Sequence, residues 1–141
     1  MLPKRISHKT SAVFYVDTSG SISDEMLNKA LTEVRGALRS NAADLFVSFV
    51  DAKIHSCTKV RTLGQVKLLK PQGGGGTDMR LCFEHYKKLR QKVNLIVVLT
   101  DGYTPWPDEA PHGVHTIVVL TQSEGGTSPE WAKTVRIGAR R

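Results

Sequence analysis

Residues 12–21 read AVFYVDTSGS, an apolar run that leads directly into a polar turn. The β-branched and aromatic residues of the run predict a buried strand. Asp17, Ser19 and Ser21 follow at alternate positions of the turn, so their side chains can point the same way. One carboxylate and two hydroxyls on a tight loop are suitable ligands for a hard divalent cation, Mg²⁺ above all.

The rest of the chain alternates between strand-like and helix-like segments, which predicts an α/β fold with a mostly parallel open sheet. Strands are expected at 12–17, 45–51, 53–60, 94–100 and 115–121, and helices at 23–39, 79–91 and, briefly, 129–133. The short link between the second and third strands indicates an antiparallel hairpin. In such sheets, ligands bind at the carboxyl ends of the strands.

Two further polar loops fall at strand or helix ends. Residues 73–78 read GGGGTD and precede the helix expected at 79–91, while residues 100–102 read TDG and follow the apolar run 95–99. The three loops offer carboxylates and hydroxyls without sulfur or imidazole, a set that favours Mg²⁺, Mn²⁺ or Ca²⁺ over zinc or copper. The glycines allow the backbone to approach an ion closely.

The motifs D-x-S-x-S, G-G-T-D and T-D-G, in this order, resemble the metal-ion-dependent adhesion site of von Willebrand factor A (VWA) domains. The resemblance implies a Rossmann-like three-layer domain and metal ligands at Asp17, Ser19, Ser21, Thr77 and Asp101. The rim of the site would then comprise Gly20, Gly76, Asp78, Gly102 and Trp106. The longer motifs are most similar to VWA-like domains of poorly characterised bacterial and phage proteins, in which a metallopeptidase-like region often precedes the domain.

What the resemblance implies about function is binding and not catalysis. Five protein ligands leave part of the shell of about six oxygens that Mg²⁺ prefers open to water or to an outside ligand. In the family, an acidic side chain of a partner protein fills that position. Family members are often encoded beside AAA-type ATPases or belong to multiprotein assemblies, so a protein partner of either kind is expected.

Two other functions compete with this interpretation. A Mg²⁺-dependent phosphohydrolase could use Asp17 as its nucleophile, but such enzymes usually carry a second acid two residues later, where this chain has Ser19. A phosphate-binding loop would need a lysine after the glycines of 73–76, and Thr77 follows instead. The formal net charge of +7 leaves a basic nucleic-acid-binding module open, although the basic residues are spread out and no reading motif is present.

Composition and length predict a single domain at 11–141 after a basic N-terminal extension at 1–10. No apolar run reaches the roughly 18 residues of a membrane span, and the N-terminus lacks the apolar core of a signal peptide. A cytoplasmic protein is therefore expected, with Cys57 and Cys82 as reduced thiols. Trp106 either anchors a partner beside the metal or packs over the edge of the sheet.

Overall fold

The structure is a computed structural model, and it describes residues 11–18, 25, 28–29, 32, 44–50, 54–60, 78–89, 93–121 and 125–137. Among these residues lie six strands and one complete helix. They are β1 (Ser11–Asp17), β2 (Asp44–Val50), β3 (Ile54–Val60), α3 (Arg80–Lys87), β4 (Leu95–Thr100), β5 (His115–Leu120) and β6 (Lys133–Arg136).

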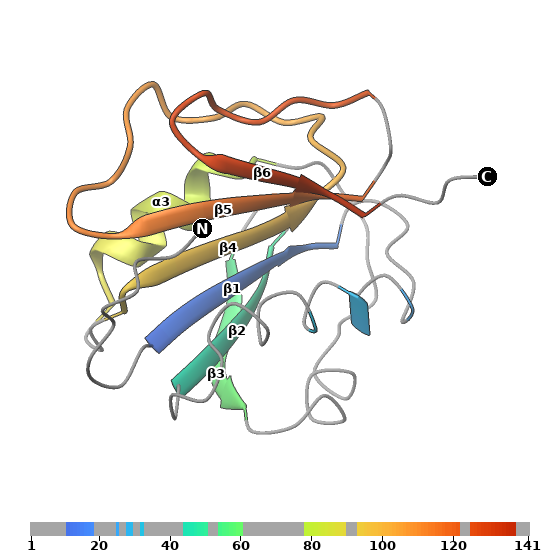
Figure 1. Cartoon of the computed structure of the whole chain (residues 1–141). Coiled ribbons are helices and arrows are strands. Elements are labelled where there is room, and N and C mark those ends of the chain that lie inside the picture. The colour runs from blue at the N-terminus through green and yellow to red at the C-terminus, as the bar shows by residue number, and fades with distance from the viewer. Residues whose placement is uncertain are drawn as a thin grey trace.

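The strands form one sheet in the order β3-β2-β1-β4-β5-β6 (Figure 1). All neighbouring pairs are parallel except β2 and β3, which form the antiparallel pair at one edge. The carboxyl ends of β1 and β4 therefore lie side by side, since Val16 is paired with Leu99. This arrangement confirms the predicted α/β sheet with its edge hairpin.

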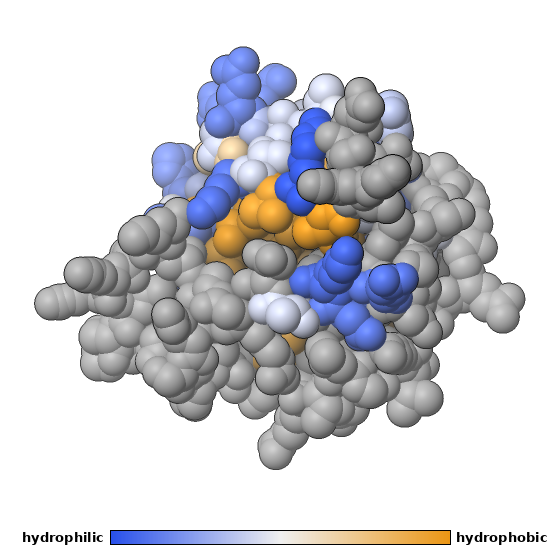
Figure 2. Space-filling model, turned by 45° about the vertical axis from the view of Figure 1, so that its right-hand side comes forward, coloured by the Kyte–Doolittle hydropathy of each residue, from blue (hydrophilic) through white to orange (hydrophobic). Residues whose placement is uncertain are grey.

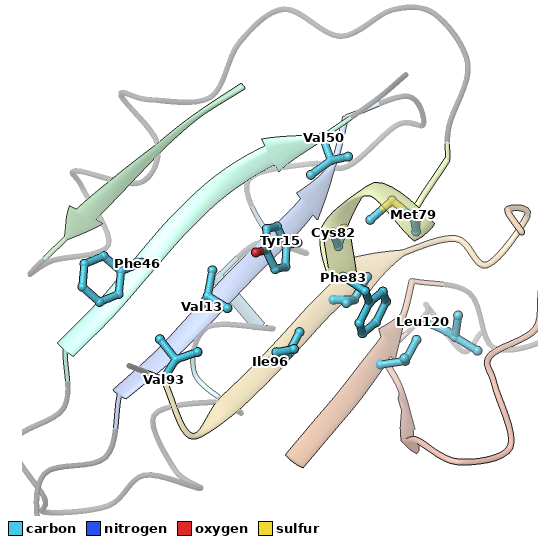
Figure 3. Packing of buried hydrophobic residues seen from close by; sticks show 12 residues of the cluster. Val13, Tyr15, Phe46, Val50, Met79, Cys82, Phe83, Val93, Ile96 and Leu120 are labelled. Atoms are coloured by element: carbon cyan, nitrogen blue, oxygen red, sulfur yellow. The ribbon is translucent and has the colours of Figure 1, made fainter. Parts of the chain in front are cut away.

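Both faces of the sheet are buried. On one face, side chains of the central strands pack against Met79, Cys82 and Phe83 at the start of α3 (Figure 3). On the other face, a second cluster built on Phe14, Val97 and their neighbours is equally inaccessible. Buried faces on both sides are what a three-layer domain requires.

The outer surface shown in Figure 2 is mainly hydrophilic where residues are coloured, and its hydrophobic part lies recessed in a hollow. Tyr103, with 62% of its surface exposed, is the large hydrophobic residue that stands outside among the described residues. No helix in the described part of the chain is long and apolar enough to cross a membrane.

The helices differ from expectation in two places. The short helix predicted at 129–133 is wrong, because Ala132 N donates to Pro129 O at 3.2 Å in a turn and the chain then enters β6. Pairing with β5 satisfies the backbone of β6, which outweighs the helix-start signal of Pro129. The helix predicted at 79–91 is shorter and ends at Lys87.

For the helix predicted at 23–39, the described residues are helical. They are Glu25, Asn28, Lys29 and Thr32. Glu25, Lys29 and Thr32 are exposed and recur at helical spacing, as the polar face opposite an apolar stripe should. The remainder of that helix lies outside the described residues.

Candidate metal and partner site

The predicted site residues divide into two groups. Described by the structure are Asp17, Asp78, Asp101, Gly102 and Trp106. Outside the described residues lie Ser19, Gly20, Ser21, Gly76 and Thr77. The geometry of the site is therefore built from the first group and its neighbours.

Asp17 ends the central strand β1 and is almost completely buried, with 1% of its surface exposed. Its Oδ2 accepts a hydrogen bond from Thr100 Oγ1 at 2.7 Å, and Thr100 Oγ1 in turn accepts one from the backbone N–H of Gly102 at 3.1 Å. Thr100 Oγ1 accepts one hydrogen bond and donates another, so its hydroxyl hydrogen points toward the Asp17 carboxylate. The first and third polar loops are thus joined at the carboxyl ends of β1 and β4.

Asp101 lies next to this junction and is partly exposed. Its Oδ1 accepts the backbone N–H of Tyr103 at 3.0 Å, a bond that closes the loop on itself. Within the described part of the chain, Oδ2 has no hydrogen-bonding partner.

The third loop also contacts the start of α3, which immediately follows the second loop. Thr104 Oγ1 accepts the backbone N–H of Met79 at 2.9 Å, so a threonine of one loop caps the helix that follows the other. Since Asp78, the last residue of the second loop, directly precedes Met79, this contact brings the end of the second loop against the third.

Asp78 has a structural partner of its own. Its two carboxylate oxygens bind the Arg80 guanidinium, each at 3.0 Å, and Oδ1 also accepts the backbone N–H of Arg80 at 3.1 Å. The hydrogen bond from the Arg80 side chain holds the pKa of Asp78 below its usual value. Asp78 therefore secures the start of α3, a role that its predicted place at the rim did not anticipate.

A segment that sequence reasoning missed supports the third loop from behind. The backbone N–H of Thr127 donates to Gly102 O at 3.1 Å, and Gly126 lies so close that a Cβ built there would overlap the carbonyl oxygen of Asp101. Gly126 also has a φ of +64°, which favours glycine. The adjacent pair Gly125-Gly126 was the available signal, but nothing local showed what would approach it.

The described donors fit a hard cation in kind. They are a buried carboxylate, a partly exposed carboxylate and hydroxyls, all of them oxygen. No group of three His, Cys, Asp or Glu side chains converges within the described ranges. The predicted ion site thus depends on the hydroxyls of Ser19, Ser21 and Thr77 as well as on the two aspartates.

The sequence matches the family described as "VWA-like domain (DUF2201)" over residues 12–138. The chain belongs to this VWA-like family. Membership supports a protein-interaction module. An uncharacterized protein of Thermotoga maritima is 34% identical over 92 residues, which make up 65% of this chain and 23% of that protein. The chain thus spans about a quarter of the length of this relative.

Two solved structures share the fold. BatB from Bacteroides thetaiotaomicron, described as a conserved hypothetical protein, has a TM-score of 0.57 at 12% identity over 93% of this chain and 91% of its own. An aerotolerance-related membrane protein from Bacteroides fragilis, with multiple mutations to serine, has a TM-score of 0.52 at 12% identity. That alignment covers 79% of this chain and 67% of the other. At such identity the similarity establishes the fold alone.

The tryptophans of this VWA-like domain are built into its frame. Trp106 Nε1 donates to Thr127 O at 3.0 Å, and Trp131 Nε1 donates to Pro107 O at 3.2 Å. Both side chains are partly buried against the cluster on the α3 side of the sheet. A partner contact by Trp106 stays a prediction, and packing against the core is the role that its described contacts support.

Two titratable groups of α3 have shifted pKa values. Burial raises the pKa of the Cys82 thiol well above its usual value, and the negative charge of Asp17 adds to the effect. Cys82 is a free, buried thiol, as expected from the sequence. His85 Nδ1 shares a hydrogen bond of 2.7 Å with Tyr15 Oη, and burial lowers the pKa of His85.

Proposed function

We propose that this VWA-like domain binds a divalent cation, Mg²⁺ in the first place, and through it a carboxylate of a partner protein. The observation that carries the proposal is the burial of Asp17 at the end of β1, where Thr100 ties it to the loop that contains Asp101. A carboxylate fixed where two ligand-bearing loops meet is preorganised for an ion.

The residues that would hold the ion are the carboxylates Asp17 and Asp101 with the hydroxyls of Ser19, Ser21 and Thr77. Mg²⁺ prefers about six oxygen ligands and usually keeps several waters, so an ion on these side chains retains a position for an outside oxygen. The bound cation would supply a positive charge and a Lewis-acidic position for that oxygen. The partial exposure of Asp101 supports an approach from outside.

The first test measures Mg²⁺ binding by the change in melting temperature. Asp17→Asn keeps the shape of the side chain and removes its charge, so the Mg²⁺-dependent rise in melting temperature should disappear. Asp108→Asn removes the same charge from an exposed loop position and should leave the rise intact. An equal Mg²⁺ response in wild type and Asp17→Asn would refute metal binding at this site.

The second test addresses the partner carboxylate. If acetate completes the shell of the bound ion, acetate and Mg²⁺ must each tighten the binding of the other, because coupling between two ligands is reciprocal. Calorimetric Mg²⁺ titrations of the wild type should therefore give a lower apparent Kd in acetate than in chloride at equal ionic strength. An unchanged Kd would leave a metal site but reject a carboxylate as its outside ligand.

A further inference from the structure

Tyr103 differs from the two tryptophans near the site because most of its surface is exposed. The indole N–H groups of Trp106 and Trp131 are hydrogen-bonded to loop carbonyls, and both rings are partly buried. Tyr103 has 62% of its surface exposed, although it follows Asp101 by only two residues. Exposed tyrosines beside a binding site are frequent anchors in protein interfaces.

The position of Tyr103 is fixed at its base. Its backbone N–H donates to Asp101 Oδ1 at 3.0 Å, so the exposed residue and the proposed metal ligand share one hydrogen-bonded turn. At the far end of the side chain, the phenol oxygen lies against Gly125, where a Cβ would overlap it. Gly125 is itself held by Arg136, whose Nη1 donates to Gly125 O at 2.9 Å.

The glycine at position 125 thus leaves room for the Tyr103 side chain to lie along the surface. The backbone of Tyr103 is thus bound to Asp101, and its phenol oxygen lies against Gly125. An apolar side chain of a partner can cover such a ring at little entropic cost, because tyrosine has few rotatable bonds. The surface therefore offers an apolar contact directly next to the proposed ion.

We propose that Tyr103 determines which acidic segment the site accepts, an inference that rests on the proposed metal-dependent function. The favoured segment carries an Asp or Glu that reaches the ion and an aromatic or large aliphatic residue within one or two positions of it. Asp101 and Tyr103 are two residues apart, at most about 7 Å of extended chain. An extended partner strand crosses that distance in about two residues.

The experiment selects a random heptapeptide display library on the immobilised domain in Mg²⁺, with bound peptides released by EDTA. Wild type should enrich peptides that combine an acidic residue with a neighbouring aromatic or large aliphatic residue. Tyr103→Ala should still enrich the acidic residue but lose the apolar neighbour. Tyr103→Phe keeps the ring and should select as the wild type does.

Affinities of one enriched peptide then give the magnitude. Loss of an aromatic contact corresponds to binding weaker by a factor between about two and about ten. Calorimetric titration of the peptide in Mg²⁺ should show this loss for Tyr103→Ala. Lys87→Ala changes an exposed residue at the other end of α3 and should bind the peptide as the wild type does. The Mg²⁺ affinity of Tyr103→Ala without peptide should equal that of the wild type.

The outcomes separate the two proposals. Enrichment of acidic residues alone, in wild type and Tyr103→Ala equally, overturns the role of Tyr103 and leaves the metal-dependent function standing. Failure of the wild type to enrich any EDTA-released acidic peptide overturns both. A Tyr103→Ala protein that binds Mg²⁺ more weakly overturns the role of Tyr103 as a partner contact, because the residue would then support the ion site itself.

Discussion

Replacement of Gly126 by alanine tests how the third loop is held in place. In the structure, a Cβ at Gly126 would overlap the carbonyl oxygen of Asp101 and crowd the Cα of Gly102. Backbone atoms cannot move aside as the end of a flexible side chain can. The 125–127 segment and the Asp101 loop must therefore separate by about an ångström before alanine fits.

The expected magnitude has two parts. Alanine at a φ of +64° is strained by about 1 kcal/mol, which lowers the melting temperature of a chain of this length by about 3 °C. Displacement of Asp101 should additionally weaken Mg²⁺ binding about 10- to 100-fold, as loss of support around metal ligands typically does. At a Mg²⁺ concentration of about 100 times the wild-type Kd, stabilisation by the ion falls from about 2.7 to between about 1.4 and 0.4 kcal/mol.

Gly113→Ala is the matched control. Gly113 has a φ of +75°, and a Cβ there meets nothing within 4 Å. This variant should therefore show the strain effect alone, with the Mg²⁺-dependent rise in melting temperature unchanged. The reasoning fails if Gly126→Ala keeps the full Mg²⁺ response, or if both variants lose it to the same degree.

Two further predictions concern groups around the site. Thr104→Val removes the acceptor for the Met79 N–H, so the urea midpoint should fall by an amount equivalent to about 1 kcal/mol and Mg²⁺ binding should weaken. Thr104→Ser keeps the hydroxyl and should retain both the urea midpoint and the Mg²⁺ binding of the wild type. Equal urea midpoints for the Val and Ser variants would contradict the helix-capping role. Burial, with a smaller effect of Lys88, lowers the pKa of His85 in the folded protein below 6.5. Below about pH 6.5 the unfolded chain therefore binds more protons than the folded protein, and the stability of the fold falls as the pH drops. In urea unfolding between pH 7 and pH 5, His85→Asn should lose stability less steeply than the wild type, and equal slopes would argue against this effect.

The sheet could be predicted from the sequence because its central strands are apolar throughout. The runs in β1 and β4 are buried on both faces, and their composition alone distinguishes them from surface segments. The last strand, β6, could not be recognised in this way. It has four residues, three of them exposed, and its pairing with β5 depends on a turn whose Pro129 suggests a helix start.

The positions of two predicted site residues followed from the sequence, but the contacts that support them did not. Asp17 and Asp101 follow predicted strands, so their meeting at one edge of the sheet follows from parallel pairing. Thr100 of the T-D-G motif holds Asp17, but other contacts of the third loop come from residues without a motif. Gly126 lies against the Asp101 carbonyl and Thr104 binds the Met79 N–H, each across 25 residues of sequence. Local patterns do not encode such distant contacts, because each depends on how the loops pack once the sheet has formed.

The two aspartates of the site differ in how firmly they are held. Asp17 is part of the central strand and shares the stability of the core, so its carboxylate should keep its position whether or not an ion is bound. Asp101 belongs to a loop that is held by hydrogen bonds and by the close approach of Gly126. Because Tyr103 donates its backbone N–H to Asp101, we expect a shift of that carboxylate toward the proposed ion to move Tyr103 as well. In the proposed function, metal binding and the surface presented to a partner would be coupled through this turn, and substitutions behind it should change both together.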